Sequence, residues 1–166
     1  MLIEMKVTGL TIDPFTNMPI IILKDLEEKN ALPIWIGLIE ASAIATELEK
    51  IQLSRPMTHD LIKNIMGELR VQVDRVEICD LCDNTFYARL YLKHDGKEFD
   101  IDSRPSDAIA LALRTNARIY VDKKVIEKSR SVDLARGGEG EKKLKEEKWA
   151  EILEGLNPED FGKYKM

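Results

Sequence analysis

The sequence predicts an α+β fold in which helices pack on a mixed, largely antiparallel β-sheet, followed by a short C-terminal helical tail. Strand-like segments separated by turn-forming residues predict two antiparallel hairpins, over residues 2–24 and 71–92. Apolar residues recur at helical spacing over residues 38–51, 58–69 and 105–113. The chain has 166 residues, 44% of them hydrophobic, which is enough to bury the core of a single domain.

Composition and charge exclude several classes of protein. A charged fraction of 33% and a net charge of −5 are typical of a soluble protein, so any phosphate-binding site must be local. No apolar run approaches the roughly 20 residues of a membrane span, and the first residues, with Glu4 and Lys6, read as a strand rather than a signal peptide. The richness in Glu and Lys favours a thermophilic source.

The two cysteines, Cys79 and Cys82, are expected to be reduced thiols in a cytoplasmic protein. Their spacing supplies half of a zinc site at most, because the sequence has no second cysteine pair. In extended chain their Cα atoms would lie about 10 Å apart, beyond the reach of a disulfide.

The first half of the fold is expected to begin with a hairpin of residues 2–12 and 18–24, joined by a turn that contains Asp-Pro and Asn. A third strand is predicted around Pro33, which places it at a sheet edge or a strand end. The helix over 38–51 follows. The next helix is expected to have Thr58 as its N-cap, with an acidic residue in the first turn, where the helix dipole favours an anion.

The second hairpin is expected to pair residues 71–78 with 86–92, and its alternation slips at Asp74-Arg75, which predicts a β-bulge. In the next strand, over 98–102, the two apolar residues share one face and the three acidic residues share the other. These acids are Glu98, Asp100 and Asp102. A solvated outer face explains them more simply than a cation site does.

The helix that begins at Pro105 is expected to be the central one, because residues 108–113 are apolar on all sides. Arg104 is its predicted N-cap and Pro105 its first residue. A short strand over 118–121 would run parallel to another strand, which makes the sheet mixed.

The C-terminal part divides by composition. A short helix over 123–129 closes a domain of residues 1–130, and a charged, Gly-containing linker is predicted over 131–148. The remaining residues, 149–166, form an amphipathic tail that is expected to dock on the body of the protein or on a second subunit. Either the edge strands or the Trp149 stripe of this tail could form a homodimer.

Three blocks of sequence, taken together and in order, carry a resemblance to a known protein family. They are LPIWIG with EA and AIA (residues 32–45), RP with THDL (55–61) and RPSDAIALA (104–112). Over about residues 1–129 the chain resembles the bifunctional nuclease domain family, and its ending is similar to that of bacterial members with a short C-terminal extension. The resemblance implies broad cleavage of DNA and RNA, so both are expected partners, but it assigns no catalytic residues.

Candidate site residues follow from what phosphodiester hydrolysis requires: an activated water and neutralisation of phosphate charge, both of which Mg²⁺ or Mn²⁺ bound to carboxylates can supply. The candidate metal ligands are Glu40, Asp60 and Asp107, each in the first turn of a predicted helix. His59, Asp60 and Asp107 are the candidate catalytic residues, since histidine suits acid and base chemistry near neutral pH.

Arg55 and Arg104 are the candidate substrate-binding residues, because a guanidinium can hold phosphate with two parallel hydrogen bonds. A structural alternative stands beside these roles. Acids in a first turn commonly cap helices, and the two arginines could lock the fold by binding those same acids. The protein would then be a non-enzymatic binding or regulatory module with the same fold.

Overall fold

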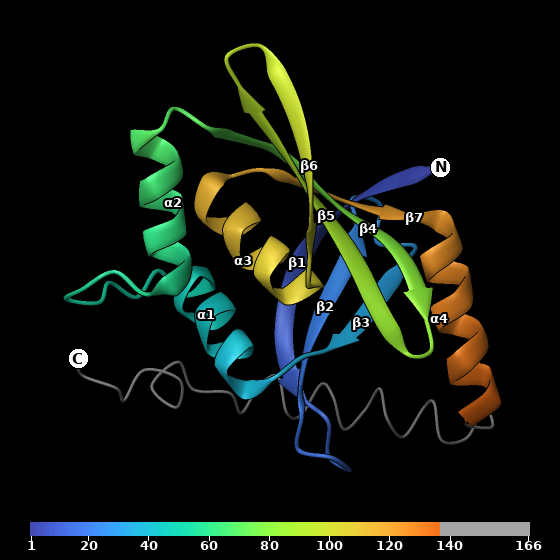
Figure 1. The fold of residues 1–166 in the computed structure, drawn as a ribbon. Coiled ribbons are helices and arrows are strands. Elements are labelled where there is room, and N and C mark those ends of the chain that lie inside the picture. The colour runs from blue at the N-terminus through green and yellow to red at the C-terminus, as the bar shows by residue number, and fades with distance from the viewer. Residues whose placement is uncertain (137–166) are drawn as a thin grey trace.

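The computed structural model describes residues 1–136, which form one seven-stranded sheet and four helices (Figure 1). The strands are β1 (Leu2–Ile12), β2 (Pro19–Asp25), β3 (Ala31–Trp35), β4 (Gln72–Cys82), β5 (Thr85–His94), β6 (Lys97–Ser103) and β7 (Arg118–Asp122). The helices are α1 (Leu38–Leu48), α2 (Thr58–Glu68), α3 (Pro105–Thr115) and α4 (Lys123–Arg136). The predicted α+β class is confirmed.

The sheet has the strand order β3-β2-β1-β7-β4-β5-β6. All neighbouring strands are antiparallel except β4 and β7, so the predicted mixed sheet is confirmed. Helix α3 carries the chain from the edge strand β6 back to β7, which lies between β1 and β4 and joins the two halves of the sheet. β3, with Pro33, is the other edge strand, as its proline predicted.

The second hairpin is longer than the sequence suggested. Asp83 and Asn84 both have positive φ, 48° and 60°, which is the backbone conformation of a tight two-residue hairpin turn. Strands β4 and β5 therefore pair up to Cys82 and Thr85. The predicted bulge is confirmed, since the register shifts between Val73 and Arg75.

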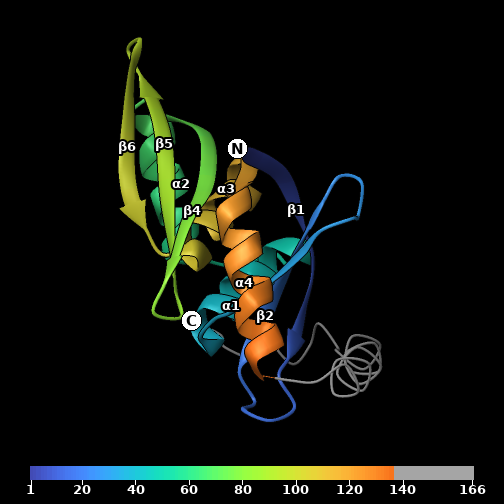
Figure 2. The same ribbon diagram turned by 90° about the vertical axis from the view of Figure 1, so that its right-hand side faces the viewer.

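The core lies between the sheet and the helices, and α3 is its central helix, as predicted (Figure 2). Its fully buried residues include Ala108, Ile109 and Ala110, and both α1 and α2 pack against it. Helix α2 is different, because none of its residues is buried. One side of α2 packs against α3, and α2 lies at the opposite edge of the molecule from α4 (Figure 1).

Some helix limits differ from those predicted. The N-cap of α2 is Met57 rather than Thr58, which is the first helical residue. Helix α1 ends at Leu48 instead of residue 51, because Lys50 adopts a positive φ of 53° that a right-handed helix does not allow. Helix α4 continues to Arg136.

Three further expectations concern the membrane, the cysteines and the tail. Within residues 1–136, no helix is long and apolar enough to cross a membrane. Cys79 and Cys82 are free thiols, as predicted. The rest of the predicted linker, from residue 137, and the tail of residues 149–166 lie outside the described residues.

Candidate functional site

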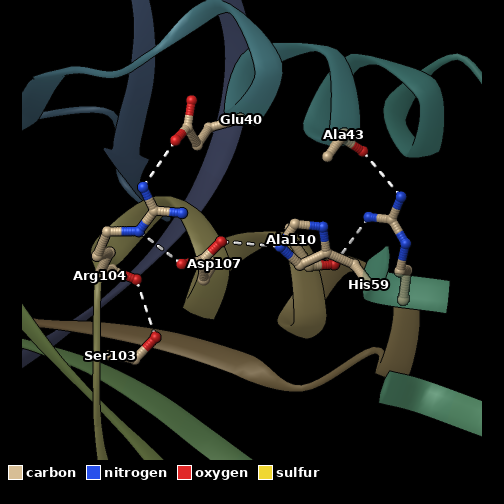
Figure 3. A network of polar contacts seen from close by, with 8 residues as sticks. Glu40, Ala43, His59, Ser103, Arg104, Asp107 and Ala110 are labelled. Atoms are coloured by element: carbon tan, nitrogen blue, oxygen red, sulfur yellow. Dashed lines mark hydrogen bonds and ion pairs between the residues drawn. The ribbon is translucent and has the colours of Figure 1, made fainter. Parts of the chain in front are cut away.

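The candidate site lies where α1, α2 and α3 begin, and Figure 3 shows the polar contacts that join Glu40, His59, Arg104 and Asp107. Each helix contributes an acidic residue from its first turn: Glu40 from α1, Asp60 from α2 and Asp107 from α3. His59 precedes Asp60 on α2, and Arg104 is the N-cap of α3. Three segments that are far apart in sequence thus bring together five of the six predicted residues, which form two networks of polar contacts.

Arg104 is the centre of the first network. Its Nε donates to Asp107 Oδ2 and its Nη1 donates to Glu40 Oε1, both over 2.7 Å. The backbone of Arg104 is extended, at φ −67° and ψ 142°, because the next residue is Pro105, and this directs its carbonyl to the N–H of Ala108 at 3.1 Å. The side chain of Arg104 remains 63% exposed despite these two bonds.

His59 extends this network from α2. Its Nε2 lies 2.9 Å from Asp107 Oδ1, and its side chain is 12% exposed. Burial raises the pKa of Asp107, but the hydrogen bonds from Arg104 and His59 outweigh burial and hold that pKa below its usual value. An ionised carboxylate can only accept, so Nε2 of His59 must carry the proton, and in the neutral ring Nδ1 is the acceptor.

Asp60 belongs to a second network, with Arg114 of α3. Arg114 Nε donates to Asp60 Oδ1 over 2.7 Å, and the Arg114 side chain is only 2% exposed. Its Nη2 donates to the carbonyl of Ala43 on α1 over 2.9 Å, and its Nη1 donates to the carbonyl of Ala110 over 3.1 Å. Arg114 therefore ties α1, α2 and α3 together.

The environment of Asp60 favours its ionised form. Burial raises the pKa of Asp60, but the hydrogen bonds from Arg114 and from the backbone N–H of Met57, at 3.0 Å, together lower it. The bond from Met57 also makes Asp60 a capping residue of α2, as the structural alternative expected.

Sequence reasoning missed Arg114. The signal was present, because this arginine is the one charged residue in the apolar run from 108 to 117. A charged residue on a helix that is buried all round must find a partner. What the sequence does not show is that the partner is Asp60, 54 positions earlier.

Arg55 lies outside both networks. It is exposed and lines a surface pocket of about 400 Å³ together with Asp60, Asn64 and Arg114. Within residues 1–136 it forms no ion pair. The two predicted phosphate-binding arginines are therefore in different states: Arg104 is paired with two carboxylates, and Arg55 has no ion-pair partner among the described residues and lies beside a third carboxylate.

The predicted metal ligands Glu40, Asp60 and Asp107 do not form one set. Glu40 and Asp107 share Arg104, whereas Asp60 is held by Arg114. In the described part of the chain, no group of three or more His, Cys, Asp or Glu side chains is placed to hold a metal ion.

Two of the three acids in the row on β6 also have partners. Glu98 pairs with Arg75 at 3.1 Å, and Asp100 pairs with Arg89 at 2.6 Å. These ion pairs lie on the sheet itself and are separate from the candidate site.

Comparison with known proteins adds a family and several relatives. Residues 21–133 match the family described as Bifunctional nuclease domain. The chain is 35% identical to an uncharacterized protein of Mycobacterium tuberculosis strain H37Rv, over 95% of this chain and 97% of that protein. It is 30% identical to Bifunctional nuclease 1 of Oryza sativa subsp. japonica and 28% identical to Bifunctional nuclease 2 of Arabidopsis thaliana. These matches cover 57% and 55% of this chain and 29% of each plant protein.

Proposed function

Because the chain belongs to the bifunctional nuclease domain family, we propose that it is a nuclease that hydrolyses phosphodiester bonds of both DNA and RNA with broad specificity. The names of the plant relatives support the reaction type. The observation that carries the proposal is the first network, in which an exposed arginine lies next to a histidine that is oriented by a carboxylate.

His59 would act as the general base. Asp107 holds the ring so that Nε2 is protonated and Nδ1 can accept a proton from water. As the water oxygen bonds to phosphorus, its proton passes to Nδ1. The ester P–O bond breaks, and the leaving oxygen takes a proton from solvent.

Arg104 would hold the scissile phosphate. Two of its five N–H groups bind Asp107 and Glu40, which leaves three for phosphate oxygens. The exposure of this side chain allows a polynucleotide to reach it. Arg55, exposed beside Asp60, would contact a neighbouring phosphate.

Charge in the first network supports assistance by Mg²⁺ or Mn²⁺. Arg104 carries one positive charge and faces two carboxylates, so these three side chains together have an excess negative charge that disfavours an incoming phosphate. Glu40 and Asp107 would hold the ion, since Mg²⁺ commonly uses one or two carboxylates and takes its other ligands from phosphates and water. When bound, it would neutralise phosphate charge and lower the pKa of a bound water.

The test is cleavage of end-labelled single-stranded DNA, duplex DNA and RNA by protein purified away from host nucleases. We expect activity with Mg²⁺ or Mn²⁺, loss with chelator, and a decrease of about 10²- to 10⁴-fold in His59→Gln. Lys123→Gln, on α4, is the matched surface control and should cleave like the wild type. Equal residual activity in wild type, His59→Gln and Asp107→Asn would refute the assignment.

One observation favours a second function, a non-enzymatic binding module. All three first-turn acids of the predicted site are held in ion pairs, and Arg114 is buried in its pair, as a purely structural role requires. This alternative predicts oligonucleotide binding by the wild type without cleavage at any divalent ion concentration.

A further inference from the structure

One face of the edge strand β6 is apolar and exposed, although it continues a face that is buried in the neighbouring strand. Phe99 pairs with Leu92 and Ile101 pairs with Leu90. Residues directly opposite in a ladder project to the same side of the sheet. Leu90 and Leu92 belong to the core, yet Phe99 and Ile101 are 46% and 48% exposed. The part of the chain that the structure describes therefore leaves this face of β6 largely uncovered.

Cationic residues lie at both ends of this face. Lys97, on the same side as Phe99, begins β6 and lines a hollow of about 510 Å³ with Arg70 and His94, which the acids Asp95 and Glu98 also line. Lys97 and Arg70 form no ion pair with any described residue. At the other end, Arg104 directly follows the last residue of β6.

The acids near the strand do not cancel this pattern. The even-numbered acids of β6 project to the opposite face, where Glu98 and Asp100 already pair with arginines. At the tip of the hairpin, Asp95 lies 3.2 Å from His94, and no acid among the described residues forms an ion pair with Lys97. The helix-side row thus runs from Lys97 through Phe99 and Ile101 towards Arg104.

We propose that the helix-side face of β6 is a binding track for a single-stranded nucleic acid that leads to Arg104. Strand β6 has seven residues and spans about 20 Å at the usual rise of a strand. Phosphates would contact Lys97 and Arg70 at one end and Arg104 at the other, and a base would stack on Phe99. Charged grooves combined with exposed aromatic rings are the usual means of binding single strands.

The same geometry selects against a duplex. Stacking on Phe99 requires the open face of a base, and in a duplex both faces of each base are covered by its neighbours. The proposal rests on the proposed function for its substrate class, because it identifies which form of nucleic acid reaches the site.

Binding can be tested apart from cleavage. Fluorescence anisotropy with labelled oligo-dT and oligo-U, in chelator and with the full chain, should show tighter binding than a duplex of equal length. Phe99→Ala and Phe99→Leu should each weaken single-strand binding about 5- to 150-fold, since both remove the ring and the second keeps an apolar side chain. Tyr87→Ala is the matched control, because Tyr87 is 44% exposed on the other face of the same hairpin.

The phosphate contacts proposed for Lys97 and Arg70 can be tested separately, through the salt dependence of binding. Lys97→Gln and Arg70→Gln should each reduce the slope of log affinity against log salt by about 0.7, the value for one phosphate contact on a single strand. Lys123→Gln should leave the slope unchanged. An unchanged slope in both test variants would overturn the placement of phosphates at this end.

A tryptophan at position 99 distinguishes nucleic acid from protein as the occupant. In Phe99→Trp, emission above the wild-type background should be that of an exposed indole and should be quenched by oligo-dT. Emission that is already blue-shifted and does not respond to oligo-dT would overturn the proposal and indicate cover by protein. A dimer in light scattering that dissociates in Phe99→Ala would overturn it in favour of a second copy.

The two proposals fail separately. Full oligonucleotide affinity in Phe99→Ala and Phe99→Leu, with normal cleavage, would reject the track and leave the nuclease proposal intact. If the wild-type protein does not cleave but binds single strands, and Phe99→Ala and Phe99→Leu weaken that binding, the nuclease proposal would be rejected and the track would stand.

Discussion

Replacing Arg114 by methionine should destabilise the protein far more than the same replacement of an exposed arginine. The side chain of Arg114 is 2% exposed and makes three hydrogen bonds, to Asp60 and to the carbonyls of Ala43 and Ala110. Removing one partner of a buried ion pair costs about 3–5 kcal/mol in free energy of unfolding. Asp60 is 33% exposed and can regain water, so we expect the lower end, about 3 kcal/mol.

This loss is measurable by urea unfolding followed by circular dichroism. For a protein of this size, about 3 kcal/mol corresponds to a decrease in Tm of roughly 6–12 °C. The slope of the urea dependence should stay constant, which would show that the mutation changes stability and not the surface exposed on unfolding. Arg89→Met is the control, because Arg89 is 43% exposed and pairs with Asp100 on the sheet surface, where such pairs contribute less than about 1 kcal/mol.

The loss of stability in Arg114→Met should also depend on pH. The folded-state pKa of Asp60 is lowered, so its pairing stabilises the protein above the unfolded-state value and is lost as pH falls through the folded-state value. The difference between wild type and Arg114→Met should therefore shrink as the solution is made acidic. A decrease in stability no larger than that of Arg89→Met, or one that is independent of pH, would refute the view that Arg114 joins the three helices.

Two further predictions concern the first network and the cysteines. The folded-state pKa of Asp107 is lowered, so Asp107→Asn should be less stable than wild type near pH 7, and urea unfolding should show the gap closing as pH falls below about 4. A constant gap would show that Asp107 is not held as a carboxylate by Arg104 and His59. Both thiols should react with Ellman's reagent without prior reduction, the exposed Cys82 first and Cys79 more slowly, because burial raises the pKa of Cys79. A single fast phase for both would contradict the burial of Cys79.

Features set by neighbouring residues could be predicted from the sequence. Arg104 as N-cap, Pro105 as first residue and Asp107 in the first turn of α3 all follow from local backbone restrictions, and the structure has each of them. The turn at Asp83 and Asn84 follows in the same way, from residues that tolerate positive φ.

Features set by tertiary packing could not be predicted. The position of β7 between β1 and β4 depends on which strand edges remain free after two hairpins have formed, and no local pattern states this. The pairing of Arg114 with Asp60 crosses 54 positions. Thr58 failed as the N-cap for a related reason: Asp60, fixed by Arg114, supplies the carboxylate for the N–H of Met57, so the helix begins one residue earlier than its best capping hydroxyl suggests.

The two Ser-Arg-Pro segments show how far a shared motif determines chemistry. Both place an arginine before a proline at the approach to a helix, and both helices have an acid in the first turn. In the second, the acid follows the proline by two positions, so Arg104 can bind Asp107 of its own helix. In the first it follows by four, and Asp60 is taken by Arg114 instead, which leaves Arg55 unpaired among the described residues. The register of the acid therefore decides which arginine is paired with carboxylates and which one, among the described residues, is not.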